Sequence, residues 1–323
     1  MKVPWRCLRL FLMAISGLTT APADPGHEIN IEAITAQLAK TPDIPELYYQ
    51  RAVNYRETSQ LKEARSDLEK ALALDPAFLP AGRELARLDD EAGQRPAGIA
   101  RLRQLLANPP PAAAFHLPGC WSALADLLLR NGDNEEALAA ATKGISLSDT
   151  LSIDLLLFRA EAQRRLGRHA ERVDDLAAAA GELKSIVLRI AWIEALIDAG
   201  RTGEALPEID HEIESSRFKA SWRIRRARTL LAASRSTDAN TELDLALAEI
   251  ETRLRPERPD LSLLCEKALV QALKGHVAEA EAGLAAARER GADAWMTRVL
   301  ESTLAARTKP SVHKPEAGSA QPP

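Results

Sequence analysis

Small and bulky apolar residues alternate along this chain at helical spacing. In segment 48–76 two triads sit at spacings of three or four residues, so each lies on one helix face: Tyr48, Ala52 and Tyr55, then Ala64, Leu68 and Ala71. Pro76 follows and ends the second helix, because proline has no amide donor for the next turn. The pattern predicts a hairpin of two short amphipathic helices, whose alanines let the two backbones approach closely.

This hairpin pattern returns about every 34 residues along most of the chain. We place seven repeat starts at Pro45, Leu79, Pro118, Ile153, Ile186, Ala220 and Leu261. Glycine falls at the turn inside five units: Gly93, Gly132, Gly167, Gly200 and Gly275. The left-handed backbone after a helix suits glycine best. One hairpin cannot bury its own apolar face, so we expect the units to stack side by side.

The spacing and the residue types resemble the tetratricopeptide repeat family, whose units carry small residues at places 8, 20 and 27. The resemblance covers roughly residues 30–294 and implies an all-α fold, a right-handed α-solenoid of stacked helix-turn-helix repeats. Two units depart from it, with Ile193 at place 8 of the fifth and Arg172 at place 20 of the fourth, where we expect wider helix crossings. A plain helical bundle is the alternative, but it would not repeat glycine at nearly constant intervals.

The first 23 residues have the order of a secretory signal peptide. Three basic residues precede an apolar run from Leu10 to Leu18, and small residues follow up to Ala23, after which cleavage is expected; cleavage after Ala21 is the other option. The apolar run is shorter than the roughly 20 residues that cross a bilayer. We therefore expect export to the periplasm or to the cell exterior, with no stable membrane anchor after the signal is removed.

The rest of the chain divides into four predicted parts. Residues 24–44 would form an N-terminal capping helix and residues 45–293 the seven repeats. Residues 294–307 would form a C-terminal capping helix. The tail, residues 308–323, is rich in proline and polar residues, a composition typical of disorder.

The charge of the chain narrows the choice of partners. The formal net charge is −4, and loss of the signal peptide takes it to −7 because the first 23 residues hold three basic residues and no acidic one. A general nucleic-acid binder needs a basic face, so we expect no nucleic-acid partner. Cys120 and Cys265 lie in the third and seventh units, too far apart along a solenoid for an intramolecular disulfide.

The sequence contains no convincing catalytic or metal-binding motif. The six histidines are scattered, and His211-Glu212 lacks the second histidine of the zinc-protease motif because Ser215 stands at that place. We find no phosphate-binding glycine loop and no glycine-flanked nucleophilic serine. We expect no metal, no cofactor and no enzymatic activity. Cys120 and Cys265 are most simply buried small apolar residues.

In the resembled family the first helix of each unit lines a groove that binds a peptide or protein partner. Carried over place by place, the resemblance implies these groove residues: Tyr49, Val53, Arg56, Arg83, Arg87, Ser122, Asp126, Leu157, Glu161, Arg164, Ile190, Glu194, Ile224, Arg228, and in the seventh unit Cys265 and Leu269. This mixture favours a segment with both apolar and charged residues. Family members that bind a chaperone's terminal carboxylate use lysine and asparagine where this chain has Tyr49 and Val53, so that specialised function is not supported.

A basic segment, residues 217–228, surrounds Trp222 in the sixth unit. One interpretation is a patch for an acidic partner, polymer or lipid headgroup. The simpler one, which we favour, is a solvated helix face whose arginines pair with Glu208, Glu212 and Glu214 just upstream.

These observations predict an exported, non-catalytic scaffold that binds a peptide or protein partner in the repeat groove. Two alternatives stay open at this point. One is a structural envelope protein that self-associates weakly through its terminal repeats, and the other is a small-ligand binder or enzyme with a site around Cys120 or Cys265.

Overall fold

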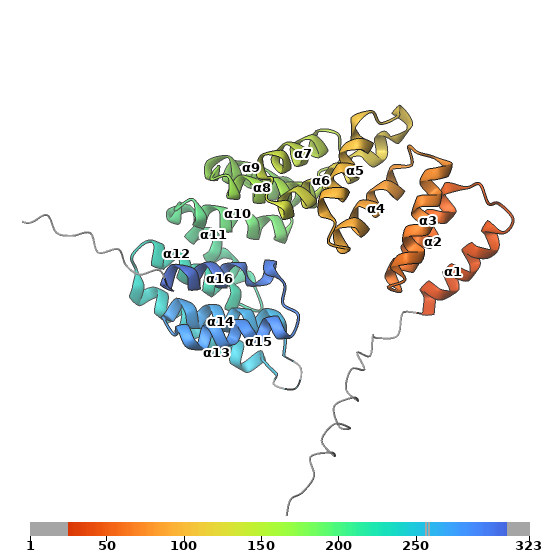
Figure 1. The fold of residues 1–323 in the computed structure, drawn as a ribbon. Coiled ribbons are helices and arrows are strands. Elements are labelled where there is room, and N and C mark those ends of the chain that lie inside the picture. Colours follow the sequence, from red (N-terminus) through yellow and green to blue (C-terminus); the bar gives the residue numbers. More distant parts are fainter. Residues whose placement is uncertain (1–24, 256, 258, 309–323) are drawn as a thin grey trace, which may run out of the picture. The chain divides into compact units, whose positions relative to one another are not determined.

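The computed structural model describes residues 25–255, 257 and 259–308 as α-helices with short connections and one 3₁₀ helix, and this part contains no β-strand. The chain divides into two compact units, one ending at Arg168 and one beginning at His169, and each is described by itself (Figure 1). The predicted signal peptide (1–23) and all but the first residue of the predicted tail lie outside the described residues.

Unit 1 contains eight α-helices in its described part. They are α1 (Pro25–Leu38), α2 (Pro45–Glu57), α3 (Leu61–Leu74), α4 (Leu79–Glu91), α5 (Arg95–Ala107), α6 (Leu117–Asn131), α7 (Asn134–Ser146) and α8 (Ile153–Arg165), with the 3₁₀ helix η1 (Pro111–His116) before α6. Each α-helix packs against the one before it. Alanines lie at these crossings: Ala52, Ala64, Ala71, Ala125 and Ala137 are all at most 1% exposed.

Unit 2 continues the same plan. Its helices are α9 (His169–Leu183), α10 (Ile186–Asp198), α11 (Thr202–Ser215), α12 (Ala220–Ala232), α13 (Ser236–Arg253), α14 (Leu261–Lys274), α15 (Val277–Glu289) and α16 (Ala294–Thr308). The helices α2, α4, α8, α10, α12 and α14 begin at six of the seven predicted repeat starts, and α6 begins one residue before the other, Pro118. The fold is an all-α solenoid of helical repeats.

The turns inside the hairpins show why glycine recurs. All five predicted turn glycines have a positive φ, between 69° and 94°. In the first and sixth units serine takes this place, with Ser59 and Ser234 both at φ 61°. The backbone bonds are the same: Gln60 N donates to Tyr55 O (2.7 Å) as Gln94 N donates to Asp89 O (2.7 Å). Five glycines therefore adopt the turn without strain, while the two serines adopt it at a cost.

The stretch Pro111–Asn131, which contains η1 and α6, is long and apolar enough by composition to cross a membrane. The criterion is one of length and composition, which a buried core helix also meets. Packing in unit 1 accounts for the apolarity, because Leu124, Leu127 and Leu128 of α6 are buried in a core shared with α4, α5 and α7.

Candidate functional site

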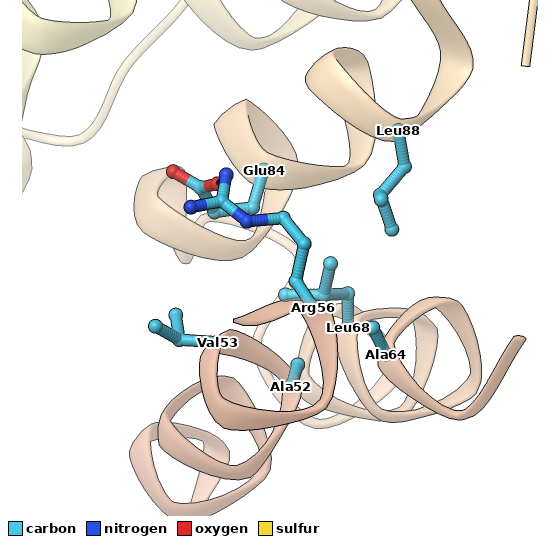
Figure 2. A pocket seen from close by; sticks show the side chains of 7 residues that line it. All are labelled: Ala52, Val53, Arg56, Ala64, Leu68, Glu84 and Leu88. Atoms are coloured by element: carbon cyan, nitrogen blue, oxygen red, sulfur yellow. Dashed lines mark hydrogen bonds and ion pairs between the residues drawn. The ribbon is translucent and has the colours of Figure 1, made fainter. Parts of the chain in front are cut away.

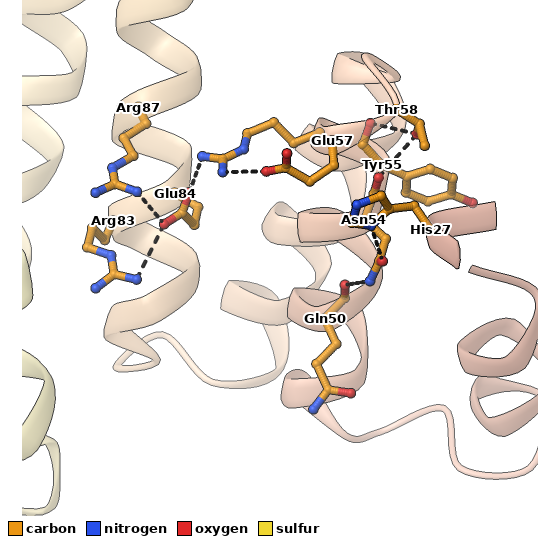
Figure 3. Close-up of polar contacts among 10 residues, drawn as sticks. His27, Gln50, Asn54, Tyr55, Glu57, Thr58, Arg83, Glu84 and Arg87 are labelled. Atoms are coloured by element: carbon orange, nitrogen blue, oxygen red, sulfur yellow. Dashed lines mark hydrogen bonds and ion pairs between the residues drawn. The ribbon is translucent and has the colours of Figure 1, made fainter. Parts of the chain in front are cut away.

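Three arginines of unit 1 share one buried carboxylate. Glu84 of α4 is 5% exposed, and its Oε2 accepts a hydrogen bond from Arg56 Nη1 of α2 at 2.8 Å. The other oxygen, Oε1, lies 3.2 Å from Arg87 Nη1 and 3.4 Å from Arg83 Nη2. Figure 3 shows Arg83 and Arg87 converging on Glu84 from the same side. Arg56 also pairs with Glu57, at 2.9 Å.

The arginines stay accessible while Glu84 does not. The Arg87 side chain is 46% exposed and that of Arg83 is 25% exposed. Arg83 also lies against α6, where a Cβ on Gly119 would come within 2.6 Å of Arg83 Nη1. Arg83 Nε is buried and has no hydrogen-bond partner among the described residues. The surface formed by α2, α4 and α6, here called the first-helix surface of unit 1, thus offers arginine donors held in place from two sides.

An apolar margin lies beside the arginines. Tyr49 of α2 meets Phe78 edge to face, with ring centroids 5.7 Å apart. Between α2 and α4 a small pocket is lined by Val53, Arg56, Glu84 and Leu88 together with alanine and leucine side chains (Figure 2). Its volume of about 10 Å³ is about what one water molecule needs. This pocket is too small for a metabolite, so the surface suits a polypeptide better than a small ligand.

The charged members of the other predicted groove residues of unit 1 form ion pairs within their own helices. Arg164 donates to both Glu161 oxygens, at 2.7 and 2.8 Å. Asp126 forms an ion pair with Arg130 at 3.3 Å, and burial raises the pKa of its carboxyl although neighbouring arginines oppose the rise. Ser122 and Leu157 are half-buried.

In unit 2 the predicted groove is not an open surface. Ile224 is 3% exposed and packs in a core with alanines and leucines of α12 and α13, so its assignment to a groove was wrong. Cys265 is also buried. Glu194 of α10 pairs with Arg228 at 2.7 Å and with Arg225 at 3.0 Å. Ile190 and Leu269 are half-buried. The predicted groove faces of the first helices in unit 2 are thus covered by contacts with other helices.

The four arginines of α12 in the basic segment 217–228 form ion pairs, as the simpler interpretation expected, but with other residues than those proposed. Arg223 and Arg226 both pair with Glu242 of α13, at 3.0 and 2.9 Å. Arg226 also pairs with Asp210, and the remaining two arginines of α12 pair with Glu194. Glu208 and Glu212 instead pair with Arg189 of α10. The error has a physical reason: stacking places a helix beside its spatial neighbours, which are 16 to 34 residues away in sequence.

The cysteines are poor candidates for a nucleophile. Cys120 is 1% exposed, and burial raises the pKa of its thiol to about 11. Burial also raises the pKa of the Cys265 thiol. A thiol is far less nucleophilic than a thiolate, so both groups are weak nucleophiles near neutral pH. Among the described residues no three histidine, cysteine or acidic side chains gather to hold a metal ion.

Comparison with known proteins agrees with the repeat pattern. The family model described as tetratricopeptide repeat matches residues 45–78, which are α2, α3 and the turn after them. Residues 45–78 therefore match a tetratricopeptide repeat. No curated protein matches it. Among solved structures, the C-terminal part of a TPR repeat-containing protein from Cytophaga hutchinsonii is 16% identical, with a TM-score of 0.54 over 71% of this chain and 95% of that one. Yeast Tom70 is 14% identical, with a TM-score of 0.53 over 88% of this chain and 59% of that one.

The site in unit 1 includes residues that were not selected from the sequence. Glu84 organises the arginines, Phe78 supports Tyr49, and Gly119 makes room for Arg83. An acidic residue between two arginines on one helix was a visible signal for Glu84. Its second link, to Arg56, joins residues 28 positions apart and was not visible in the spacing.

Proposed function

We propose that this protein is an exported, non-catalytic scaffold that binds an acidic segment of a protein partner on the first-helix surface of unit 1. The tetratricopeptide repeat fold supports protein–protein interaction in general terms. The observation that carries the finer proposal is the group of three arginines, Arg56, Arg83 and Arg87, around the single buried carboxylate of Glu84.

An arriving carboxylate would complete this arrangement. Guanidinium groups bind carboxylates through two parallel hydrogen bonds, and Arg83 and Arg87 have most of their donors unused by Glu84. Hydrogen bonds to charged groups contribute roughly 1.5–3 kcal/mol where water is excluded, and less on an exposed surface. Attraction by the exposed arginines would also speed association with an acidic partner at low salt. Tyr49 and Phe78 supply the apolar contact beside the charges.

The first experiment compares acidic peptides with their neutral counterparts. We would pan the full chain against a library of amidated 12-residue peptides and measure the selected binders by fluorescence anisotropy. Each selected peptide is then remade with Gln for Glu and Asn for Asp. The proposal expects the acidic form to bind at least about tenfold more tightly at low salt, a difference of about 1.4 kcal/mol. Equal affinity of the two forms would refute the acidic specificity.

Matched variants locate the site. Arg83→Gln with Arg87→Gln should lose the preference for acidic peptides and should fold normally. Arg103→Gln with Lys70→Gln removes two exposed charges from the second helices α5 and α3 and should bind like the unchanged protein. If the control pair weakens binding as much as the arginine pair, general charge and not the first-helix surface is responsible.

The proposed exported location is tested separately. The order of residues 1–23 supports it. Fractionation of producing cells, followed by N-terminal sequencing, should find a mature chain that begins at Asp24 or at Pro22. A cytoplasmic protein that retains its first residues would refute export and would leave the binding proposal standing.

A further inference from the structure

The short helix η1 presents an exposed apolar surface just before α6. Phe115 is 87% exposed, the largest value among the large apolar residues that the structure describes. Pro111, Ala112 and Ala114 of η1 are exposed as well, and together with Phe115 they are here called the apolar patch of η1. Residues 104–125 contain no aspartate, glutamate, lysine or arginine, although these residues make up 27% of the chain. The patch is therefore not a charged, solvated loop, and exposed apolar surface of this kind is typical of a contact site.

The backbone that carries the apolar patch is held in place. Ala113 in the middle of η1 is 7% exposed and belongs to the core shared by α4, α5 and α6. Its N donates to Pro110 O at 2.9 Å, and residues 109–111 are three prolines whose rings restrict φ. The ring of Phe115 meets that of His116 edge to face, with centroids 5.4 Å apart. A partner would therefore bind to an element that is already ordered, which lowers the entropy cost of binding.

The apolar patch lies at the edge of the first-helix surface of unit 1. The helix η1 contacts both α4 and α6, and Ala113 shares its core with Leu79, one turn before Arg83 on α4. Gly119, four residues after Phe115, is the glycine whose added Cβ would come within 2.6 Å of Arg83 Nη1. Four residues span at most about 14 Å. A stretch of about four extended partner residues can therefore reach from Arg83 to the patch.

We propose that the apolar patch of η1 binds an apolar side chain of the partner segment, aromatic or of the size of leucine. This side chain lies within about four residues of the acidic residue that Arg83 and Arg87 bind, a spacing set by the reach of the chain. The inference rests on the proposed function and adds a second requirement to it. Phe115 is then a specificity-determining residue, because it distinguishes this partner from other acidic segments.

Burial of apolar surface provides the physical basis of this contact. A side chain placed on the exposed ring of Phe115 removes apolar surface of both groups from water, which favours binding. Ion pairs on an exposed surface contribute little by themselves, so the apolar contact decides which acidic segments bind tightly. Apolar groups would then lie on both sides of the arginines, since Tyr49 of α2 and Phe78 lie at the other edge of α4.

Two parallel selections from one library of amidated 12-residue peptides test the inference, one with the unchanged full chain and one with Phe115→Ala. Because Phe115 is exposed, the variant should fold like the unchanged protein. Peptides selected by the unchanged chain should carry an aromatic or leucine-sized residue within about four positions of an aspartate or glutamate. Peptides selected by Phe115→Ala should keep the acidic residue and lose this apolar enrichment. Equal enrichment in both selections would overturn the inference.

A double-mutant cycle on one selected peptide measures the contact itself. Replacing the apolar residue of the peptide with serine should weaken binding to the unchanged chain at least about tenfold, and binding to Phe115→Ala less than about twofold. Ile29→Ala removes a side chain of α1 that is 65% exposed, and this control should bind both peptides like the unchanged chain. If the serine replacement has the same effect on the unchanged chain and on Phe115→Ala, the apolar residue binds elsewhere and the inference fails.

The inference and the proposed function can fail separately. If Arg83→Gln with Arg87→Gln abolishes the acidic preference while Phe115→Ala changes nothing, the acidic segment stands and the apolar contact is refuted. If the selected peptides share an apolar residue that depends on Phe115 but no acidic residue, the acidic specificity fails and the contact with η1 stands. Selection of no peptide by the unchanged chain would refute both.

Discussion

Two glycine-to-alanine changes should have opposite effects on the stability of this protein. Gly98 lies at the crossing of α5 with α4, where an added Cβ would lie 2.5 Å from the carbonyl oxygen of Ala86 and 3.2 Å from Leu127 Cδ1. Gly181 near the end of α9 is exposed, and a Cβ there would meet nothing within 4 Å. Both variants add the same methyl group. The difference between their free energies of unfolding therefore reports the close approach of α4 and α5.

The expected magnitudes follow from this geometry. Alanine is up to about 1 kcal/mol better than glycine in a helix, so Gly181→Ala should raise the free energy of unfolding by about 0.5–1 kcal/mol. At Gly98 the same gain is outweighed by overpacking, which costs about 1–3 kcal/mol, and a backbone oxygen cannot rotate away as a side chain can. Gly98→Ala should therefore lower the free energy of unfolding by about 1–2 kcal/mol.

Urea unfolding followed by far-UV circular dichroism measures both variants. The midpoint should fall for Gly98→Ala and rise for Gly181→Ala, with the slope of each transition unchanged. The two glycines lie in different units, so hydrogen exchange should place the loss of protection in unit 1 for Gly98→Ala. Equal stability of Gly98→Ala and Gly181→Ala would show that α4 and α5 do not approach each other this closely at Gly98.

Three further predictions concern the turns, a buried charge and the thiols. Ser59→Gly and Ser234→Gly should each raise the free energy of unfolding by up to about 1 kcal/mol, because both serines have φ near 61°. A lower free energy of unfolding for both variants would contradict the turn geometry. Burial alone would raise the pKa of Glu194, but its arginine partners lower it on balance, so its contribution to stability should be lost as the pH falls through and below the usual glutamate value. Glu194→Gln should cost about 3 kcal/mol at pH 7 and flatten this acid-induced loss in pH-dependent urea titrations; a variant as stable as the parent would refute the buried pairing. Cys120 and Cys265 should react with Ellman's reagent only slowly in the folded protein and rapidly in urea, and fast labelling without urea would show that they are accessible.

The helices could be predicted from the sequence because their signals are local. The spacing of Ala52, Ala64 and Ala71 sets the faces of one hairpin, and the same spacing puts the first residue of most first helices at a predicted repeat start. The positive φ of Gly132 and Gly275 is predicted locally too, because each glycine directly follows the end of a helix. These features need only the period of a helix and the conformational freedom of glycine.

The site could be predicted only in part. Its ion pairs join side chains of different helices, and the local spacing of residues does not indicate which side chains meet. Arg83 and Arg87 were selected by their places in the repeat, but nothing near them indicated that Arg56 would reach the same carboxylate. Ile224 occupies a groove place in the family pattern and is buried here. That burial depends on packing against α13 and α14, which the local pattern does not show.

Cross-linking in the producing cell tests the central claim most directly. A photoreactive amino acid at Val53, which lines the first-helix surface of unit 1, is compared with the same residue at Lys70 on the exposed side of α3. Mass spectrometry then identifies the segments that are captured. The account predicts capture from position 53 alone, of segments rich in aspartate and glutamate, and loss of capture in the Arg83→Gln, Arg87→Gln background. Equal capture from both positions, or captured segments without acidic residues, would contradict it.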